Sequence, residues 1–187
     1  MVKALIVHNN YNTSAPSGEN QVFINETSAL QGKVQIETFT ELNGSLSYNW
    51  LVNLLSIGFP IVSLFNFFRL KLTICRFKPD IVHFHNVRPF LTPLVLNVPT
   101  RATKILTVHN YRMFCPKGTF FDGKDICHLC DKSISKSITS GCEKRTIKRV
   151  FNYLQFLGGK IFRSYEKIDG FIVLNNLQER FIRQRFP

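Results

Sequence analysis

Acidic residues are scarce in this sequence. The 187 residues include 12 Asp and Glu against 24 Lys and Arg, which leaves a formal net charge of +12. Such an excess indicates nucleic acid, an anionic membrane face or a phosphorylated substrate as partner, or a solvated basic face with no partner. The sequence contains no DNA- or RNA-binding motif, and its aromatic residues do not alternate with basic ones as a stacking platform requires. We therefore expect no nucleic acid as partner.

The sequence also lacks the marks of secretion and of disorder. Met1 leads directly into an apolar strand pattern, without the charged, apolar and small-residue segments that make up a signal peptide. No internal repeat or low-complexity segment is present, and 44% hydrophobic residues with 18 phenylalanines supply a core. We expect one cytoplasmic domain, in which the cysteines are thiols or metal ligands rather than disulfides.

Short apolar, β-branched segments alternate with helix-compatible segments along the chain. The expected strands are 3–8, 34–39, 80–84, 103–109 and 169–174. The expected helices or helical connections begin at Ser17 and cover 88–97, 144–167 and 176–186. This alternation predicts an α/β fold, a single Rossmann-like, doubly wound parallel sheet with right-handed crossovers, into which a cysteine-rich loop is inserted.

The run from Trp50 to Phe68 contains no charged residue. Its length approaches that of a membrane span, but Pro60 interrupts it, and basic residues follow between Arg69 and Lys78. Three interpretations stay open: a pair of buried core helices, a helix lying on an anionic membrane, and a transmembrane span. We favour the core helices, because the strands on both sides belong to one sheet. A position at the inner face of a membrane is the second interpretation.

A helix start is expected at Ser17, Gly18 and Glu19. Ser17 can cap the helix, Gly18 lets the backbone pass close to a ligand, and Glu19 lies in the favourable first turn. The free N–H groups of such a helix start form a site for anions, although an ordinary strand–loop–helix connection has the same pattern. The residues expected to form the apolar stripe of this helix are Val22, Phe23 and Leu30.

Polar residues follow the expected third and fourth strands, at the edge where open α/β sheets bind ligands. The residues concerned are His85 and Asn86 after one strand, and His109, Asn110 and Arg112 after the other. His83 and His85 alternate to the same face of their strand and could together bind a metal. No carboxylate lies near them in the sequence, so we expect these two histidines to line the strand end instead.

The cysteines indicate a metal site. Cys127 and Cys130 form a Cys-x-x-Cys pair, and Cys115 and Cys142 lie at equal distances on either side. These four thiolates could form a tetrahedral site, which predicts a structural zinc that orders a long polar loop. Three alternatives stay open: His128 as a replacement ligand, four unpaired thiols, and a disulfide.

Several of these segments together resemble a known family. They are Ser17–Glu19, Lys78–Asn86, Val108–Arg112, Cys115–Gly118, Asp122–Lys124, Cys127–Cys130 and Ile168–Leu174. In order and spacing they are similar to the N-terminal, acceptor-side domain of family 4 glycosyltransferases, which have the GT-B fold. The resemblance covers nearly the whole of residues 1–187. One departure is Ser17, which stands where the family usually has the first glycine of its turn.

The resemblance implies transfer of a sugar from a nucleotide-sugar donor to an acceptor in glycan or polysaccharide biosynthesis. The uncharged run and the basic residues after it, Trp50 to Lys78, predict contact with a membrane or with a lipid-linked acceptor. The resemblance places Ser17 and Gly18 near the donor phosphates and His109, as the catalytic residue, near the transferred sugar. It assigns substrate binding also to His85, Asn86, Asn110 and Arg112. It further implies a second Rossmann-like domain, in cis or in trans, that supplies most nucleotide contacts. Residues 1–187 alone are then expected to be inactive.

Two other classes of protein stay open. One is a non-catalytic domain that binds a partner or an acceptor, and the other is a zinc-containing module that binds nucleic acid through its basic surface. Nucleic-acid binding would weaken steeply with salt, which distinguishes the second alternative. At the level of single residues, His109 could also do no more than cap a strand end.

Overall fold

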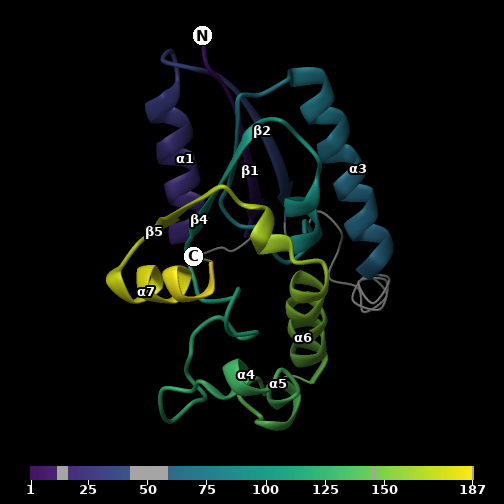
Figure 1. The fold of residues 1–187 in the computed structure, drawn as a ribbon, viewed down its shortest axis with the longest axis vertical. Coiled ribbons are helices and arrows are strands. Elements are labelled where there is room, and N and C mark those ends of the chain that lie inside the picture. The colour runs from purple at the N-terminus through teal and green to yellow at the C-terminus, as the bar shows by residue number, and fades with distance from the viewer. Residues whose placement is uncertain (12–16, 43–58, 145, 187) are drawn as a thin grey trace.

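A computed structural model describes residues 1–11, 17–42, 59–144 and 146–186, shown in Figure 1. Its five parallel strands form one sheet in the order β2-β1-β3-β4-β5. The strands are β1 (Lys3–Asn10), β2 (Gln35–Leu42), β3 (Ile81–Phe84), β4 (Thr103–Val108) and β5 (Gly170–Val173). The predicted α/β fold with a single parallel sheet is therefore confirmed.

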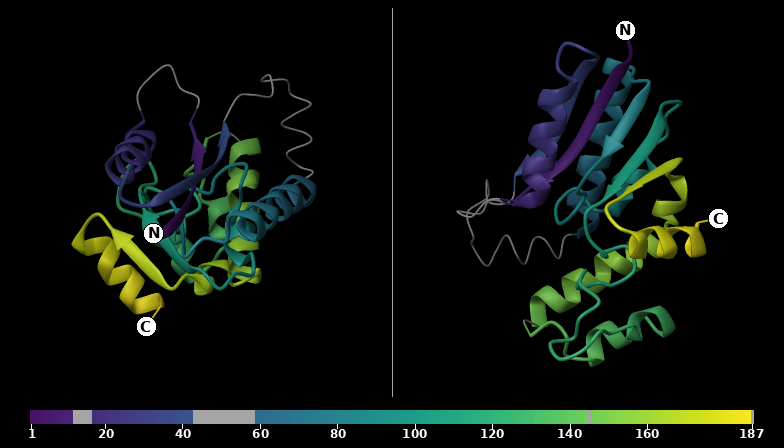
Figure 2. Two further views of the ribbon diagram at one scale, coloured as in Figure 1. Left: turned by 90° about the horizontal axis from the view of Figure 1, so that it is seen from above. Right: turned by 90° about the vertical axis from the view of Figure 1, so that its left-hand side faces the viewer.

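The helices occupy the segments between the strands. The α-helices are α1 (Gly18–Leu30), α3 (Phe59–Phe77), α4 (Leu129–Lys132), α5 (Lys136–Thr139), α6 (Thr146–Ile161) and α7 (Asn176–Arg185). Two 3-10 segments, η1 (Pro93–Asn97) and η2 (Ser164–Lys167), complete the described elements. Helix α1 lies on one side of the sheet and α3 on the other, as the two views of Figure 2 show.

The two faces of the sheet differ in polarity because successive strand residues alternate between them. On the α3 side the sheet contributes a fully apolar core. Its members are Leu5, Val7, Val82, Phe84 and Leu106, packed with Leu70, Ile74 and Phe77 of α3. The residues of opposite parity at the carboxyl ends include His8, His83 and Thr107, all buried. The carboxyl end of the α1 face is thus lined by hydrogen-bonding side chains.

Helix α1 packs on the polar strand ends with a face that is itself partly polar. None of its residues is buried, and Val22, expected in an apolar stripe, is 39% exposed. The half-buried positions include Glu19, Asn20, Phe23 and Glu26, whose helical spacing puts them on one face. The prediction of an apolar stripe is therefore wrong for Val22. The face of α1 that packs on the sheet includes polar residues, because the strand ends beneath it are polar. Likewise Ser17 occupies the N-cap position but makes no side-chain capping bond.

Helix α3 continues the uncharged run from Phe59, with Pro60 in its first turn, where a missing N–H is tolerated. Residues 50–58, the first part of that run, lie outside the described residues. In the rest, Leu70 and Ile74 are buried in the core, as expected for a core helix. The opposite face is also apolar but exposed, and Phe65 and Leu72 are 62% and 70% exposed. In the described part of the chain, no helix has the length and apolar character needed to cross a membrane.

The cysteine-rich loop between β4 and α6 has a small hydrophobic core of its own. Phe114 and Phe120 lie in it with Phe181 of α7, and the Phe120 and Phe181 rings stack with centroids 5.0 Å apart. Cys115 is buried in the same cluster. Aromatic packing therefore holds this loop against α7.

Candidate functional site

The strand order places a topological switch point between β1 and β3. The chain leaves β1 for β2 on one side and returns to β3 on the other, so a crevice is expected outside these two strand ends. The ends are tied together by two hydrogen bonds. The Asn9 backbone N–H donates to the Asn86 carbonyl at 2.7 Å, and Asn86 Nδ2 donates to the Asn9 carbonyl at 3.1 Å. This joint fixes the geometry of the residues around it.

Four histidines gather at this edge of the sheet, and we call His8, His83, His85 and His109 the histidine cluster. The rings of His83 and His85 have centroids 4.3 Å apart, and those of His85 and His109 stack at 5.4 Å. His85 Nδ1 lies 3.2 Å from His109 Nε2. The cluster thus connects the ends of three neighbouring strands.

Glu26 of α1 supplies the carboxylate that the sequence did not place near these histidines. His83 Nδ1 donates to Glu26 Oε1 at 2.6 Å, and His85 Nε2 lies 3.3 Å from Oε2. Burial opposes ionisation of Glu26, but the hydrogen bonds from both histidines outweigh it and lower the pKa of the carboxyl to about 2. Our expectation that no carboxylate accompanies His83 and His85 is therefore wrong.

The other two histidines of the cluster are held in their neutral form. Burial lowers the pKa of His109 to about 4, with the nearby charges of His85 and His8 acting in the same direction. Burial also lowers the pKa of His8 to about 4, although a hydrogen bond with Asn20 opposes it. At neutral pH both rings therefore offer one donor and one acceptor nitrogen.

A second contact joins the start of α1 to the end of β4. Asn110 Nδ2 donates to Glu19 Oε1 at 2.8 Å, and Asn110 Oδ1 accepts from the Arg112 backbone N–H at 3.0 Å. Burial raises the pKa of the nearby Tyr11 hydroxyl, and the positive charge of Arg112 opposes this increase. The helix start and the His-Asn-Tyr-Arg segment, about which the sequence analysis made separate predictions, therefore meet in space.

A pocket of about 40 Å³ lies between the ends of β3 and β4. The predicted site residues that line it are His85, Asn86, His109, Asn110 and Arg112. Ser17 and Gly18 do not line it. They lie at the start of α1, and of the three residues at this helix start it is Glu19 that contacts another site residue, Asn110. A Cβ added at Gly18 would meet nothing within 4 Å, so packing in the described chain does not require glycine there.

One group of side chains at this edge of the sheet could hold a metal ion. Among the described His, Cys, Asp and Glu residues, one set of three has ligand atoms within 4.8 Å of one another: Glu26, His83 and His85. An ion bound at about 2.0–2.1 Å in tetrahedral geometry keeps its ligand atoms roughly 3.3 Å apart. The 2.6 Å contact of Glu26 with His83 is closer, and corresponds to a charged hydrogen bond.

The cysteines of the predicted zinc site, all of them described, form no such set. No disulfide joins them, and the ring of His128, between Cys127 and Cys130, lies tilted against the ring of Phe120 with centroids 4.8 Å apart. Aromatic packing already orders the loop, so zinc is not needed for that purpose. The zinc site itself stays a prediction.

The site contains residues that the sequence analysis missed: His8, Glu26, Arg88 and Thr107. Thr107 Oγ1 lies 2.8 Å from His83 Nε2, so both nitrogens of that ring are engaged. The sequence contained one sign of the position of Glu26. Glu19, Phe23 and Glu26 recur at helical spacing, whereas the residues between them fall on other faces of the helix. That spacing puts the three residues on one face of the helix, and the sheet decides what this face contacts.

Comparison of the chain with protein-family models, with curated proteins and with solved structures gives no match. The fold and the site therefore define its class: an α/β protein with one parallel sheet and a cluster of histidines, amides and a carboxylate at the switch point.

Proposed function

We propose that the chain is the acceptor-side domain of a glycosyltransferase, which transfers a sugar from a nucleotide-sugar donor to an acceptor in glycan biosynthesis. One observation carries the proposal. Segments that carry the sequence resemblance converge at one edge of the sheet, where Asn110 contacts Glu19 and His109 contacts His85. Switch points of parallel sheets are the usual place for ligands.

His109 is the proposed catalytic residue. With Glu26 ionised, His85 directs its Nε2 proton to that carboxylate, and His85 Nδ1 accepts from His109 Nε2. His109 Nδ1, which makes no hydrogen bond within the described residues, is then an acceptor for a sugar hydroxyl. Sugar transfer develops positive charge on the ring. The carboxylate of Glu26 would stabilise that charge through the two histidines.

Asn110 and Arg112 are proposed to bind the acceptor. Glu19 fixes the Asn110 side chain, and the Arg112 side chain lies against Gly118, where an added Cβ would come within 2.6 Å of Arg112 Cγ. A pocket of about 40 Å³ is too small for a nucleotide. We therefore propose that a second Rossmann-like domain, in cis or in trans, holds the nucleotide, and that both walls are needed to orient the reacting groups.

Contact with an anionic membrane, at which a lipid-linked acceptor would be met, is a further part of the proposal. The outer face of α3 exposes a stripe of apolar residues, Leu64, Phe65, Phe68 and Leu72. Lys71 and Arg76 flank the stripe, and α3 contains no acidic residue. A cavity of about 200 Å³, lined in part by Leu64 and Phe162, lies beside it. An apolar face with basic flanks is typical of helices that lie on anionic lipid.

Transfer assays test the proposed function. The chain is incubated with labelled UDP-, GDP- and dTDP-sugars and membrane extract, with and without a second Rossmann-like domain supplied as a separate or fused chain. We expect transfer when both are present and background with the chain alone. Transfer by the chain alone would overturn the two-wall proposal. Absence of transfer in every combination, with His109→Ala indistinguishable from wild type in acceptor binding, would overturn the enzymatic proposal.

A further inference from the structure

Arg88 is a buried cation that has no counterion among the described residues. The residue is 2% exposed, and the single hydrogen bond of its side chain within the described chain runs from Nη2 to the Arg112 carbonyl at 3.3 Å. Its Nε and Nη1 atoms are buried with no partner among the described residues. More exposed arginines do have partners: Arg76 and Arg183, with side chains 74% and 78% exposed, pair with Glu37 and Glu179. In the described part of the chain, the buried arginine is thus without a carboxylate partner.

This arrangement is costly for the protein alone. A guanidinium does not lose its proton in a protein, so Arg88 cannot become neutral as His8 and His109 do. A buried charge is tolerated when a counterion and hydrogen bonds compensate it. None of the described carboxylates pairs with Arg88: Glu26 contacts two histidines, and Glu19 accepts from Asn110 through Oε1 while its buried Oε2 has no hydrogen-bond partner among the described residues. Compensation must therefore come from outside the described chain.

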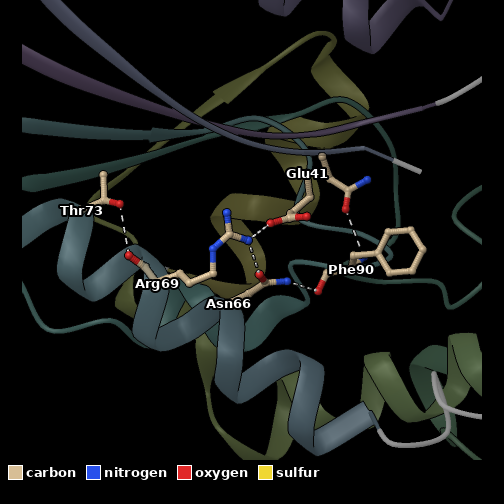
Figure 3. A network of polar contacts seen from close by, with 6 residues as sticks. Glu41, Asn66, Arg69, Thr73 and Phe90 are labelled. Atoms are coloured by element: carbon tan, nitrogen blue, oxygen red, sulfur yellow. Dashed lines mark hydrogen bonds and ion pairs between the residues drawn. The ribbon is translucent and has the colours of Figure 1, made fainter. Parts of the chain in front are cut away.

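The loop that carries Arg88 is held in place from several sides. Asn86 Oδ1 accepts from the Arg88 backbone N–H at 3.0 Å, and Gln155 Nε2 donates to the Pro89 carbonyl at 2.6 Å. Figure 3 shows the next anchor, where Asn66 of α3 donates to the Phe90 carbonyl and itself accepts from Arg69. A guanidinium on so well anchored a loop is preorganised for a ligand.

Arg88 lines the pocket between β3 and β4, together with Asn110 and Arg112. The pocket has a volume of about 40 Å³, and one water needs about 10–15 Å³. The pocket therefore holds a group of about three water-sized atoms, such as the head of one oxyanion. Guanidinium groups bind phosphate and carboxylate better than other anions because their donors match the oxygen geometry.

We propose that Arg88 binds one oxyanion group, a phosphate or a carboxylate, in this pocket. The site lies beside His109, so an acceptor that carries such a group would be oriented by it. The anion has two sources, a free inorganic ion or a group on an organic ligand. Oxyanion binding does not depend on sugar transfer, and its test uses no transfer assay.

The test measures phosphate binding by the full chain. Wild type, Arg88→Met and the surface control Arg183→Met are titrated with inorganic phosphate at constant ionic strength, and the thermal unfolding midpoint and the ³¹P line width are recorded. We expect phosphate to raise the midpoint of wild type and control in a saturable way, as ligands of the folded state do. Arg88→Met should bind phosphate roughly 10- to 100-fold more weakly.

A second arm distinguishes the sources. Glucose 1-phosphate replaces inorganic phosphate: a similar affinity assigns the site to a group on an organic ligand, and binding of inorganic phosphate alone assigns it to a free ion. Arg88→Lys, which keeps the charge but not the planar donors, serves if the methionine variant does not fold, and should also weaken binding. An identical phosphate response of wild type and the Arg88 variants, or no response in wild type, would overturn the proposal.

Discussion

His83 Nδ1 donates a 2.6 Å hydrogen bond to Glu26 Oε1, across 57 residues of sequence. The contact ties α1 to the carboxyl end of β3. Because the Glu26 side chain also approaches His85, one carboxylate organises the two central histidines of the site.

Removing the charge of Glu26 should destabilise the domain. We expect Glu26→Gln to lower the free energy of unfolding by about 1–3 kcal/mol, because it weakens charged hydrogen bonds at a buried edge. Urea denaturation at pH 7 measures the change. The control is Glu37→Gln, whose partner Arg76 has a side chain that is 74% exposed, and which should change stability by less than about 1 kcal/mol. Equal effects of the two substitutions would show that the Glu26 contact does not stabilise the fold.

Stability should fall as the pH decreases from about 6.5 to about 4. The folded-state pKa values of His8 and His109 are lowered to about 4, so the unfolded chain binds more protons in this window. Folding stability therefore rises with pH across it. Urea denaturation at several pH values should show a smaller slope for the double variant His8→Gln/His109→Gln than for wild type. His128→Gln, outside the cluster, should keep the wild-type slope, and an unchanged slope in the double variant would refute the assignment.

His109→Ala should lower turnover of the assembled enzyme by roughly 100-fold or more, without unfolding the domain. The physical reason is the loss of the nitrogen that faces the sugar and of its link to Glu26 through His85. Steady-state kinetics with a circular dichroism control measure both effects. Lys124→Ala on the exposed loop is the matched control. Turnover close to the wild-type value would show that His109 is not catalytic and only caps the end of β4.

The exposed stripe of α3 should bind anionic vesicles. We expect sedimentation with phosphatidylglycerol vesicles, little with phosphatidylcholine, and a decrease as salt is raised. The double substitution Phe65→Ser/Phe68→Ser should weaken binding about tenfold or more, since each ring removed takes apolar area out of the contact. Phe121→Ser/Ile126→Ser, on the cysteine-rich loop, removes comparable exposed apolar area and should have no effect. Equal sedimentation with both lipids, or equal loss in both variants, would exclude the stripe as the contact.

The cysteine-rich loop should contain about one zinc per chain when the protein is purified without chelator. Cys127→Ser/Cys130→Ser should abolish the metal and leave the sheet folded, because Phe114, Phe120 and Phe181 pack the loop independently. Elemental analysis of the purified variants measures the content. Glu26→Gln should retain the zinc, whereas its loss in that variant would place the metal at Glu26, His83 and His85 instead.

The sequence by itself determined the sheet. Short apolar, β-branched runs such as 103–108 are typical of buried strands. Because these strands alternate with helices along the chain, they form a parallel sheet. It also determined that His85 and His109 lie at strand ends, because their place follows from local pattern. The order of the strands then brings those ends to one edge.

Only the tertiary structure decided which side chains meet there. The pairing of Glu26 with His83 depends on how α1 rests on the sheet, and a half-buried polar helix face has the same composition as a solvated one. Arg88 is likewise an ordinary basic residue in the sequence. Its burial, with no counterion among the described residues, follows from the anchoring of residues 86–90 by Asn9, Asn66 and Gln155, which are distant along the chain. Contacts of this range depend on packing between elements, which no local pattern encodes.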